Sequence, residues 1–141
     1  MSINLVTTPI RSTFSKNKNL IIGEWCRYEI KENENYKIEL SKYHWDDTKK
    51  MKKDFFYLER LYKKSILSLT QSMNYYHNTD KSQRYWEIIL SSFLSYIIQI
   101  VWDKWETINY AMNESPVDET RAINSEDNPL AFQDFEDFLK N

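Results

Sequence analysis

Glycine is almost missing from this sequence. Only one of the 141 residues is glycine, Gly23, whereas average usage of about 7% would give roughly ten. Phosphate-binding loops of the Rossmann and P-loop kinds need several closely spaced glycines. We therefore expect no such loop and no cofactor in this stretch, and the phosphates of any nucleotide-linked substrate would have to be held elsewhere.

Cysteine and histidine are also rare, and the net charge is small. The single cysteine, Cys26, excludes an intrachain disulfide and fits a cytoplasmic setting; no base adjoins it, so a buried thiol is favoured over a nucleophile. The two histidines lack a ligand spacing, and we expect no metal. The net charge of −2 gives no overall field for nucleic acid or an anionic membrane, and the N-terminus lacks the pattern of a secretory signal.

What the sequence does have is a long apolar stretch at residues 82–113. Between Tyr85 and Trp105 nearly every position is apolar or aromatic, and no proline interrupts it. The polar exceptions recur every four residues and form one stripe on a helix: Glu87, Ser91, Ser95, Gln99 and Asp103. The uninterrupted run, 88–102, is shorter than the about 20 residues of a membrane span. We expect a buried core helix and no transmembrane segment, with peripheral membrane association as the minor alternative.

Apolar spacing predicts an α/β chain that is predominantly α-helical. Short strands are expected at about 3–7 and 20–23, forming either the edge of an α/β sheet or a hairpin, and residues 36–40 form a third strand or an extended segment. Long helices are expected at about 47–77 and 82–112. The short polar turn between these helices predicts an antiparallel hairpin.

The character of the chain changes after this first segment, 1–112. Residues 113–128 are polar and acidic and are interpreted as a linker. Pro129 then suits the first position of a further helix over 129–141. The chain ends as that helix completes about three turns, so we interpret it as truncated, with aromatic side chains that need a partner surface.

Polar and aromatic residues follow the second expected strand. Ligands of α/β folds bind beyond the carboxyl ends of strands, so Glu24 and Trp25 are candidate substrate contacts. The alternative is an ordinary loop with a tucked tryptophan.

The densest polar and aromatic cluster is Y-H-W-D-D at residues 43–47. His44 can act as a general base or acid, Asp46 could orient it, and Trp45 could contact substrate. A helix cap is the simpler role for Asp47. The lysines just after this cluster could bind single-stranded nucleic acid, but we favour a solvated helix face and expect no nucleic-acid partner.

Further candidates lie on the second long helix. Arg84 offers a fork for carboxylate or phosphate and Trp86 a platform for a sugar ring; an ion pair between Arg84 and Glu87 is the competing reading. Gln99 and Asp103 are costly to bury unpaired. They either hydrogen-bond partners or line a cavity, and we assign them a supporting role behind the substrate contacts.

Taken together, these motifs resemble the N-terminal part of a family of transferases encoded in bacterial surface-carbohydrate clusters, including O-antigen and lipopolysaccharide loci. The motifs are G-E-W-C, Y-H-W-D-D, N-x-x-H, S-x-R-Y-W-x-I and Q-x-x-x-D-K-W. The resemblance covers roughly residues 3–110. Matching positions are 23–26, 43–47, Asn74, His77, Ser82, 84–86, Ile88, Gln99, Asp103 and Trp105. The chain departs from the family at residues 91–93, where S-S-F replaces a Gly-Pro-Trp-like stretch and should leave the helix straighter.

The resemblance implies the start of a larger, GT-B-like transferase with two Rossmann domains. Such an enzyme would transfer a glycosyl or related group from an activated donor to a glycan or lipid-linked acceptor in the cytoplasm, at the inner face of the membrane. The fragment alone would be inactive without its C-terminal remainder. In that scheme His44 and Asp46 are catalytic. A non-catalytic helical interaction module is the alternative.

Overall fold

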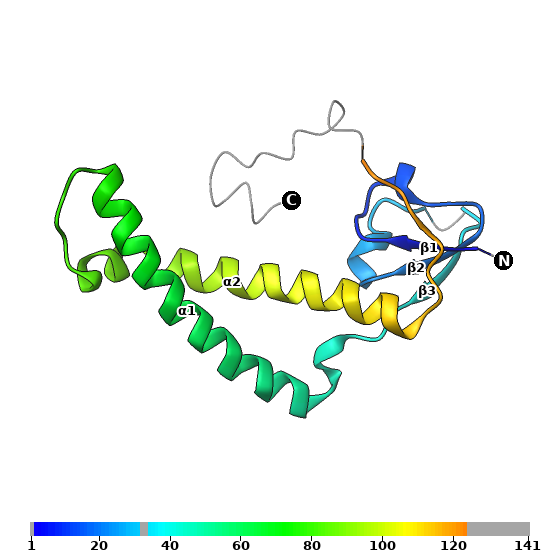
Figure 1. The fold of residues 1–141 in the computed structure, drawn as a ribbon. Helices are drawn as coiled ribbons and strands as arrows, with labels where there is room; N and C mark the ends of the chain where they lie inside the picture. Colours follow the sequence, from blue (N-terminus) through cyan, green and yellow to red (C-terminus); the bar gives the residue numbers. More distant parts are fainter. Residues whose placement is uncertain (1, 32–33, 124–141) are drawn as a thin grey trace. The chain divides into compact units, whose positions relative to one another are not determined.

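The computed structural model describes residues 2–31 and 34–123 and divides them between two compact units. One, the sheet unit, comprises Met1–His44 and Glu106–Asn141; the other, the helical unit, is Trp45–Trp105. Three strands come first, two long helices follow, and a short fourth strand comes after them (Figure 1). The expected α/β class with mostly helical content is confirmed.

The sheet unit is built on four parallel strands in the order β3-β2-β1-β4. The strands are β1 (Ile3–Val6), β2 (Lys18–Ile21), β3 (Lys37–Leu40) and β4 (Glu119–Thr120). Because β1 and β2 run parallel, the hairpin alternative is wrong. A parallel pair needs a crossover connection rather than a tight turn. Here the crossovers carry the 3-10 turns Arg11–Thr13 and Glu24–Arg27.

Apolar side chains on the central strands form the core of the sheet unit. Leu5, Val6, Leu20 and Ile21 are all at most 4% exposed. Such nearly continuous apolar runs are typical of strands covered on both faces. The remaining buried members come from the crossovers and from the end of the second long helix: Phe14, Ile22, Cys26 and Ala111. Cys26 is therefore a buried thiol, as expected; its Sγ donates to the backbone oxygen of Val6.

Two asparagines interrupt this apolar core. Asn4 of β1 and Asn19 of β2 stand directly opposite each other and are both fully buried. The Nδ2 of Asn4 donates to the Oδ1 of Asn19 at 2.8 Å and to the backbone oxygen of Thr13 at 2.9 Å. The same Oδ1 accepts from the backbone N–H of Ser15. This network binds the first crossover to the sheet. It also favours one register of β1 against β2, because a shift of either strand would leave buried amides without hydrogen-bond partners.

The helical unit consists of α1 (Thr48–Tyr76) and the part of α2 (Gln83–Glu114) that extends to Trp105. Asp47 is the N-cap of α1, and its side chain accepts from the backbone N–H groups of Lys49 and Lys50. A carboxylate there satisfies unpaired helix donors and complements the positive end of the helix. The expected cap role of Asp47 is thus confirmed.

Helix α2 is less buried than expected. Ile88, Val101 and Trp105 are 60–68% exposed among the described residues. A helix with a single long neighbour buries one stripe and leaves the others open. By length and composition α2 could cross a membrane, since its most apolar 18-residue window has a mean hydropathy of 1.3 and is 11% buried. A single helix of this kind is weak evidence for a membrane span, so none is inferred.

Residues expected to form a linker contain structure of their own. α2 continues to Glu114, and Glu119–Thr120 forms β4, which pairs with β1. Strand β4 is held by local polar contacts: the Thr120 hydroxyl donates to the backbone oxygen of Leu5, and the Asp118 carboxylate accepts from the N–H of Ile3. The helix expected over 129–141 lies outside the described residues.

Candidate functional site

The carboxyl edge of the parallel sheet gathers the loops that carry most of the predicted chemistry of the sheet unit. All four strands point the same way, so the residues that follow each strand meet at one edge. Residues 7–8 follow β1, residues 22–25 follow β2 and residues 41–44 follow β3. Ligands of open α/β sheets bind outside this edge. Glu24, Trp25 and His44 all belong to these loops.

Gly23 and Trp25 form a close contact after β2. The backbone of Gly23 is extended, with φ −173° and ψ 157°, so any residue could adopt it. A Cβ at this position, however, would lie 2.4 Å from the indole Nε1 of Trp25. The glycine therefore permits the close approach of the indole, which is 42% exposed and would have to move for a larger residue. The side chain of Glu24 is exposed and pairs with Arg27 at 3.4 Å.

His44 lies at the end of the segment that follows β3 and is 1% exposed. One of its ring nitrogens lies within 4.8 Å of a carboxylate oxygen of Glu106, in the α2 portion of the same unit. A carboxylate beside an imidazole can fix its tautomer and stabilise its protonated form. The ring of Tyr43 meets the imidazole edge-on at 4.9 Å. Asp46, the expected orienting acid, is exposed.

Sequence reasoning missed Glu106, although a signal was present. The polar stripe predicted from the sequence ended at Asp103. Glu106 lies three residues farther on, which is the other spacing that keeps a side chain on the same helix face. Continuing the stripe by that step would have found it.

In the helical unit, Trp45 is joined to a buried acid. Its indole Nε1 donates to the Oδ2 of Asp54 at 3.0 Å, and Lys50 donates to the same oxygen. Burial alone would raise the pKa of Asp54, but the hydrogen bonds from Lys50 and Trp45 and the positive charge of Lys50 outweigh it and hold the pKa below its usual range. Asp54 was also missed, because a lone acid within a lysine run resembles a solvated helix face.

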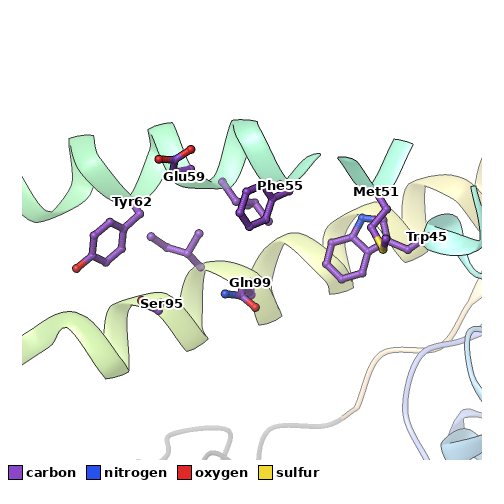
Figure 2. A pocket seen from close by; sticks show the side chains of 9 residues that line it. Trp45, Met51, Phe55, Glu59, Tyr62, Ser95 and Gln99 are labelled. Carbon is purple, nitrogen blue, oxygen red and sulfur yellow. The ribbon is translucent and has the colours of Figure 1, made fainter. Parts of the chain in front are cut away.

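A pocket of about 340 Å³ lies between α1 and α2 (Figure 2). Its volume is at the lower end of the range for small-molecule sites, about 300–1,000 Å³. Trp45 stands at one end beside Met51, and Tyr62 at the other. The residues that line it are Trp45, Met51, Phe55, Leu58, Glu59, Tyr62, Ser95, Ile98 and Gln99. The polar stripe of α2 thus faces this pocket at Ser95 and Gln99.

Tyr62 and Glu87 connect the two helices near the Tyr62 end of the pocket. Burial of the phenol and the negative charge of the Glu87 carboxylate raise the pKa of Tyr62 above its usual value of about 10. The phenol of Tyr62 therefore gives up its proton less readily than an ordinary tyrosine.

Arg84 and Trp86 lie at the start of α2. Arg84 is exposed and pairs with Glu87 at 3.6 Å, which is the competing reading from the sequence. Trp86 is 6% exposed; its Nε1 donates to the Oδ1 of Asn74, and His77 stacks on its ring at 5.6 Å. A substrate role for Arg84 and Trp86 stays a prediction, as does a supporting role for Asp103, which is half-buried on α2.

Comparison with known protein families places this chain among the transferases. The sequence model of a family described as "LIC12162 family transferase" matches residues 3–141. The chain belongs to this transferase family. No match was found among curated proteins or among solved structures. The expectation of a transferase family is confirmed.

Proposed function

We propose that this chain is part of a transferase that moves a glycosyl or related group from an activated donor to a glycan or lipid-linked acceptor. The reaction would serve the synthesis of a bacterial surface polysaccharide, the O-antigen or lipopolysaccharide. The observation that carries this proposal is the family match over residues 3–141. The parallel sheet supports it, because its carboxyl edge assembles a histidine, an aromatic platform and polar groups in the place where α/β enzymes bind ligands.

In the proposed reaction His44 is the general base. One of its ring nitrogens takes the proton of an acceptor hydroxyl as the acceptor oxygen bonds to the transferred group, and the leaving group departs with the electrons of the broken bond. Glu106, within 4.8 Å of the ring, would stabilise the imidazolium that results. Asp46 is the alternative partner for His44. Glu24 and Trp25, which follow β2, would contact the substrate.

The helical unit would supply further substrate contacts. Trp45 and Gln99 line its pocket, Arg84 and Trp86 are the proposed contacts at the start of α2, and Asp103 would support them. We propose that α1 and α2 form an antiparallel hairpin at the start of a GT-B-like enzyme. A separate C-terminal part would hold the donor nucleotide, and the enzyme would work in the cytoplasm at the inner face of the membrane.

The proposal can be tested in the bacterium that encodes this chain. Deleting the gene should remove or shorten the surface polysaccharide seen on a gel, and the wild-type gene should restore it. A gene with His44→Gln should fail to restore it, because loss of a general base costs about 10²–10⁴ in rate. Lys16→Gln is the control, since Lys16 is exposed in the same unit and precedes β2, at the opposite end from the candidate site.

Because His44 is buried, the two variants also need a test of folding. Circular dichroism and soluble yield of purified His44→Gln should match those of Lys16→Gln. A folded His44→Gln protein that restores the polysaccharide fully would refute the role of His44 as a base. An unchanged polysaccharide after deletion would refute the proposed pathway.

The exposed apolar side chains of the helices favour one alternative, a non-catalytic interaction module. Phe55, Ile88 and Val101 are 60–68% exposed. If this alternative holds, replacing all three by serine should abolish complementation while His44→Gln preserves it. Sequencing downstream of the gene discriminates further, since a nucleotide-binding half in the same reading frame supports the transferase.

A further inference from the structure

The pocket of the helical unit is elongated and mostly apolar. On α1 it extends from Met51 to Tyr62, eleven residues apart, which corresponds to roughly 16 Å along a helix. Phe55 lies between these ends (Figure 2). Leu58 of α1 and Ile98 of α2 also line the pocket. An apolar pocket of this length suits a flexible chain better than a compact ring system.

The helix that forms one wall of the pocket is strongly basic over its first half. Residues 48–64 contain seven lysines or arginines and two acids, although the whole chain has a net charge of −2. Both acids are already paired: Asp54 with Lys50, and Glu59 with Lys63. Within the described part of the chain, the other five basic groups take part in no ion pair: Lys49, Lys52, Lys53, Arg60 and Lys64.

One of these basic groups adjoins the pocket. Lys52 follows Met51 and precedes Phe55 by three residues, so it lies within one turn of two side chains that line the pocket. Its side chain is exposed. A negatively charged group at the Trp45 end of the apolar pocket would therefore lie near the positive charge of Lys52.

From this juxtaposition we propose that the helical unit binds one hydrocarbon chain of an anionic lipid, with the chain in the pocket and the head group against the basic start of α1. Apolar burial would supply affinity and the lysines would select the charge of the head group. A second copy of this chain suits the site less well, because two basic α1 faces would repel each other. A single-stranded nucleic acid could contact the basic residues but has no hydrocarbon chain to fill the apolar pocket.

Lipid binding can be measured without any group transfer, so it does not depend on the proposed reaction. Only the further step of calling this lipid the acceptor rests on the proposed function. A protein that binds the lipid but fails to restore the surface polysaccharide would separate the two proposals.

The test uses soluble amphiphiles below their micelle concentration and titration calorimetry on the full 141-residue chain. Dodecyl phosphate carries both the chain and the anionic head. Butyl phosphate keeps the head and shortens the chain, and dodecyl phosphocholine keeps the chain and neutralises the head. We expect dodecyl phosphate to bind at least about tenfold tighter than either. Butyl phosphate lacks methylenes that each contribute to affinity when buried, and dodecyl phosphocholine lacks the net negative charge that the lysines would select.

Two substitutions place the site in the pocket. Ser95→Trp fills it and should weaken dodecyl phosphate at least about tenfold. Gln99→Trp, at an exposed position of the same wall, is the second variant in case Ser95→Trp disturbs packing. Ser68→Trp, at an exposed position of α1 outside the pocket, is the matched control and should bind as the wild type does.

A third variant tests the charge. Lys49→Gln/Lys52→Gln/Lys53→Gln should lose the preference for phosphate over phosphocholine, and it spares Lys50 because that residue pairs with Asp54. The matched control makes the same charge change at three exposed lysines of the sheet unit: Lys16, Lys31 and Lys42.

Several outcomes would overturn the inference. The inference is wrong if dodecyl phosphate does not bind, or if butyl phosphate or dodecyl phosphocholine binds as tightly as dodecyl phosphate. It is also wrong if the Ser95→Trp, Gln99→Trp and Ser68→Trp proteins bind dodecyl phosphate with equal affinity. A dimer that sediments as such, is dissociated by Ser95→Trp and takes up no dodecyl phosphate would show that a second copy occupies the pocket instead.

Discussion

The indole Nε1 of Trp86 donates to the Oδ1 of Asn74 across the turn between α1 and α2, at 2.8 Å. The same Oδ1 accepts from the backbone N–H of Lys81 at 2.9 Å, and the Nδ2 of Asn74 donates to the backbone oxygen of Lys81 at 2.8 Å. The imidazole of His77 stacks on the ring of Trp86. In the described structure, therefore, the N-x-x-H and R-Y-W motifs meet at one turn and hold it together.

Replacing Trp86 by phenylalanine should destabilise the chain by about 1–2 kcal/mol. The change keeps an aromatic ring beside His77 but removes the hydrogen bond to Asn74 and part of the buried surface. Urea unfolding followed at the helix signal measures the effect. Trp105→Phe is the control, because Trp105 is 62% exposed and its replacement should change stability by less than about 0.5 kcal/mol. Equal effects of the two substitutions would contradict this account of the turn.

Replacing Asn19 by alanine should cost about 2–4 kcal/mol, because it removes the acceptor of the buried Ser15 N–H and one of the two acceptors of the buried Asn4 amide. Asn17→Ala removes a neighbouring asparagine whose side chain bonds to Ser2 at an exposed position, and should cost much less. Chemical denaturation of both variants gives the comparison. If Asn19→Ala were no more destabilising than Asn17→Ala, the buried network would not hold the first crossover.

Asp54 should make stability depend on pH at the acid end. Its pKa is lower in the folded chain than the about 4 expected in the unfolded chain. The unfolded state therefore binds a proton first, so the stabilisation is complete above about pH 4 and is lost as pH falls through the folded pKa. At pH 7 the wild type should exceed Asp54→Asn by about 1–3 kcal/mol, and the difference should disappear in acid.

Thermal unfolding of the wild type and Asp54→Asn between pH 2 and 7 checks this prediction. Asp80→Asn is the control, because Asp80 is exposed in the turn that precedes α2. A constant gap between wild type and Asp54→Asn down to the lowest pH would show that the charge of Asp54 does not contribute.

Replacing Gly23 by alanine should move the indole of Trp25 while costing less than about 1 kcal/mol of stability. The new Cβ would lie 2.4 Å from the Nε1 of Trp25, and an indole that is 42% exposed can swing toward solvent. The indole N–H resonance of Trp25 in an NMR spectrum should shift. In a Trp25→Ala background, Gly23→Ala should have no destabilising effect, since nothing remains to collide with. An unmoved resonance would contradict the close packing.

Local pattern was enough to predict the helices. The spacing of Leu58, Tyr62 and Leu69 is helical, and the cap at Asp47 is a contact between neighbours in sequence. These signals span a few residues, so no tertiary information is needed to interpret them. α1 covers Thr48–Tyr76 and α2 covers Gln83–Glu114, close to the expected 47–77 and 82–112.

The sheet was harder to predict, because pairing joins residues far apart in the chain. Nothing local distinguishes a parallel β1–β2 pair from a hairpin when each strand is four residues long. Strand β4 has two residues in a polar, acidic stretch. It forms a strand because the edge of β1 supplies hydrogen-bond partners, which sequence composition does not reveal.

The sequence by itself determined the class of chain, the two long helices, the family motifs and the residue types available for chemistry, since all of these follow from composition and short-range periodicity. Only the tertiary structure decided which side chains meet. It brought His44 within reach of Glu106, covered Trp86 with His77, gave the buried Asp54 its two donors and left much of α2 exposed. Such contacts depend on how distant segments pack, and no local pattern encodes them.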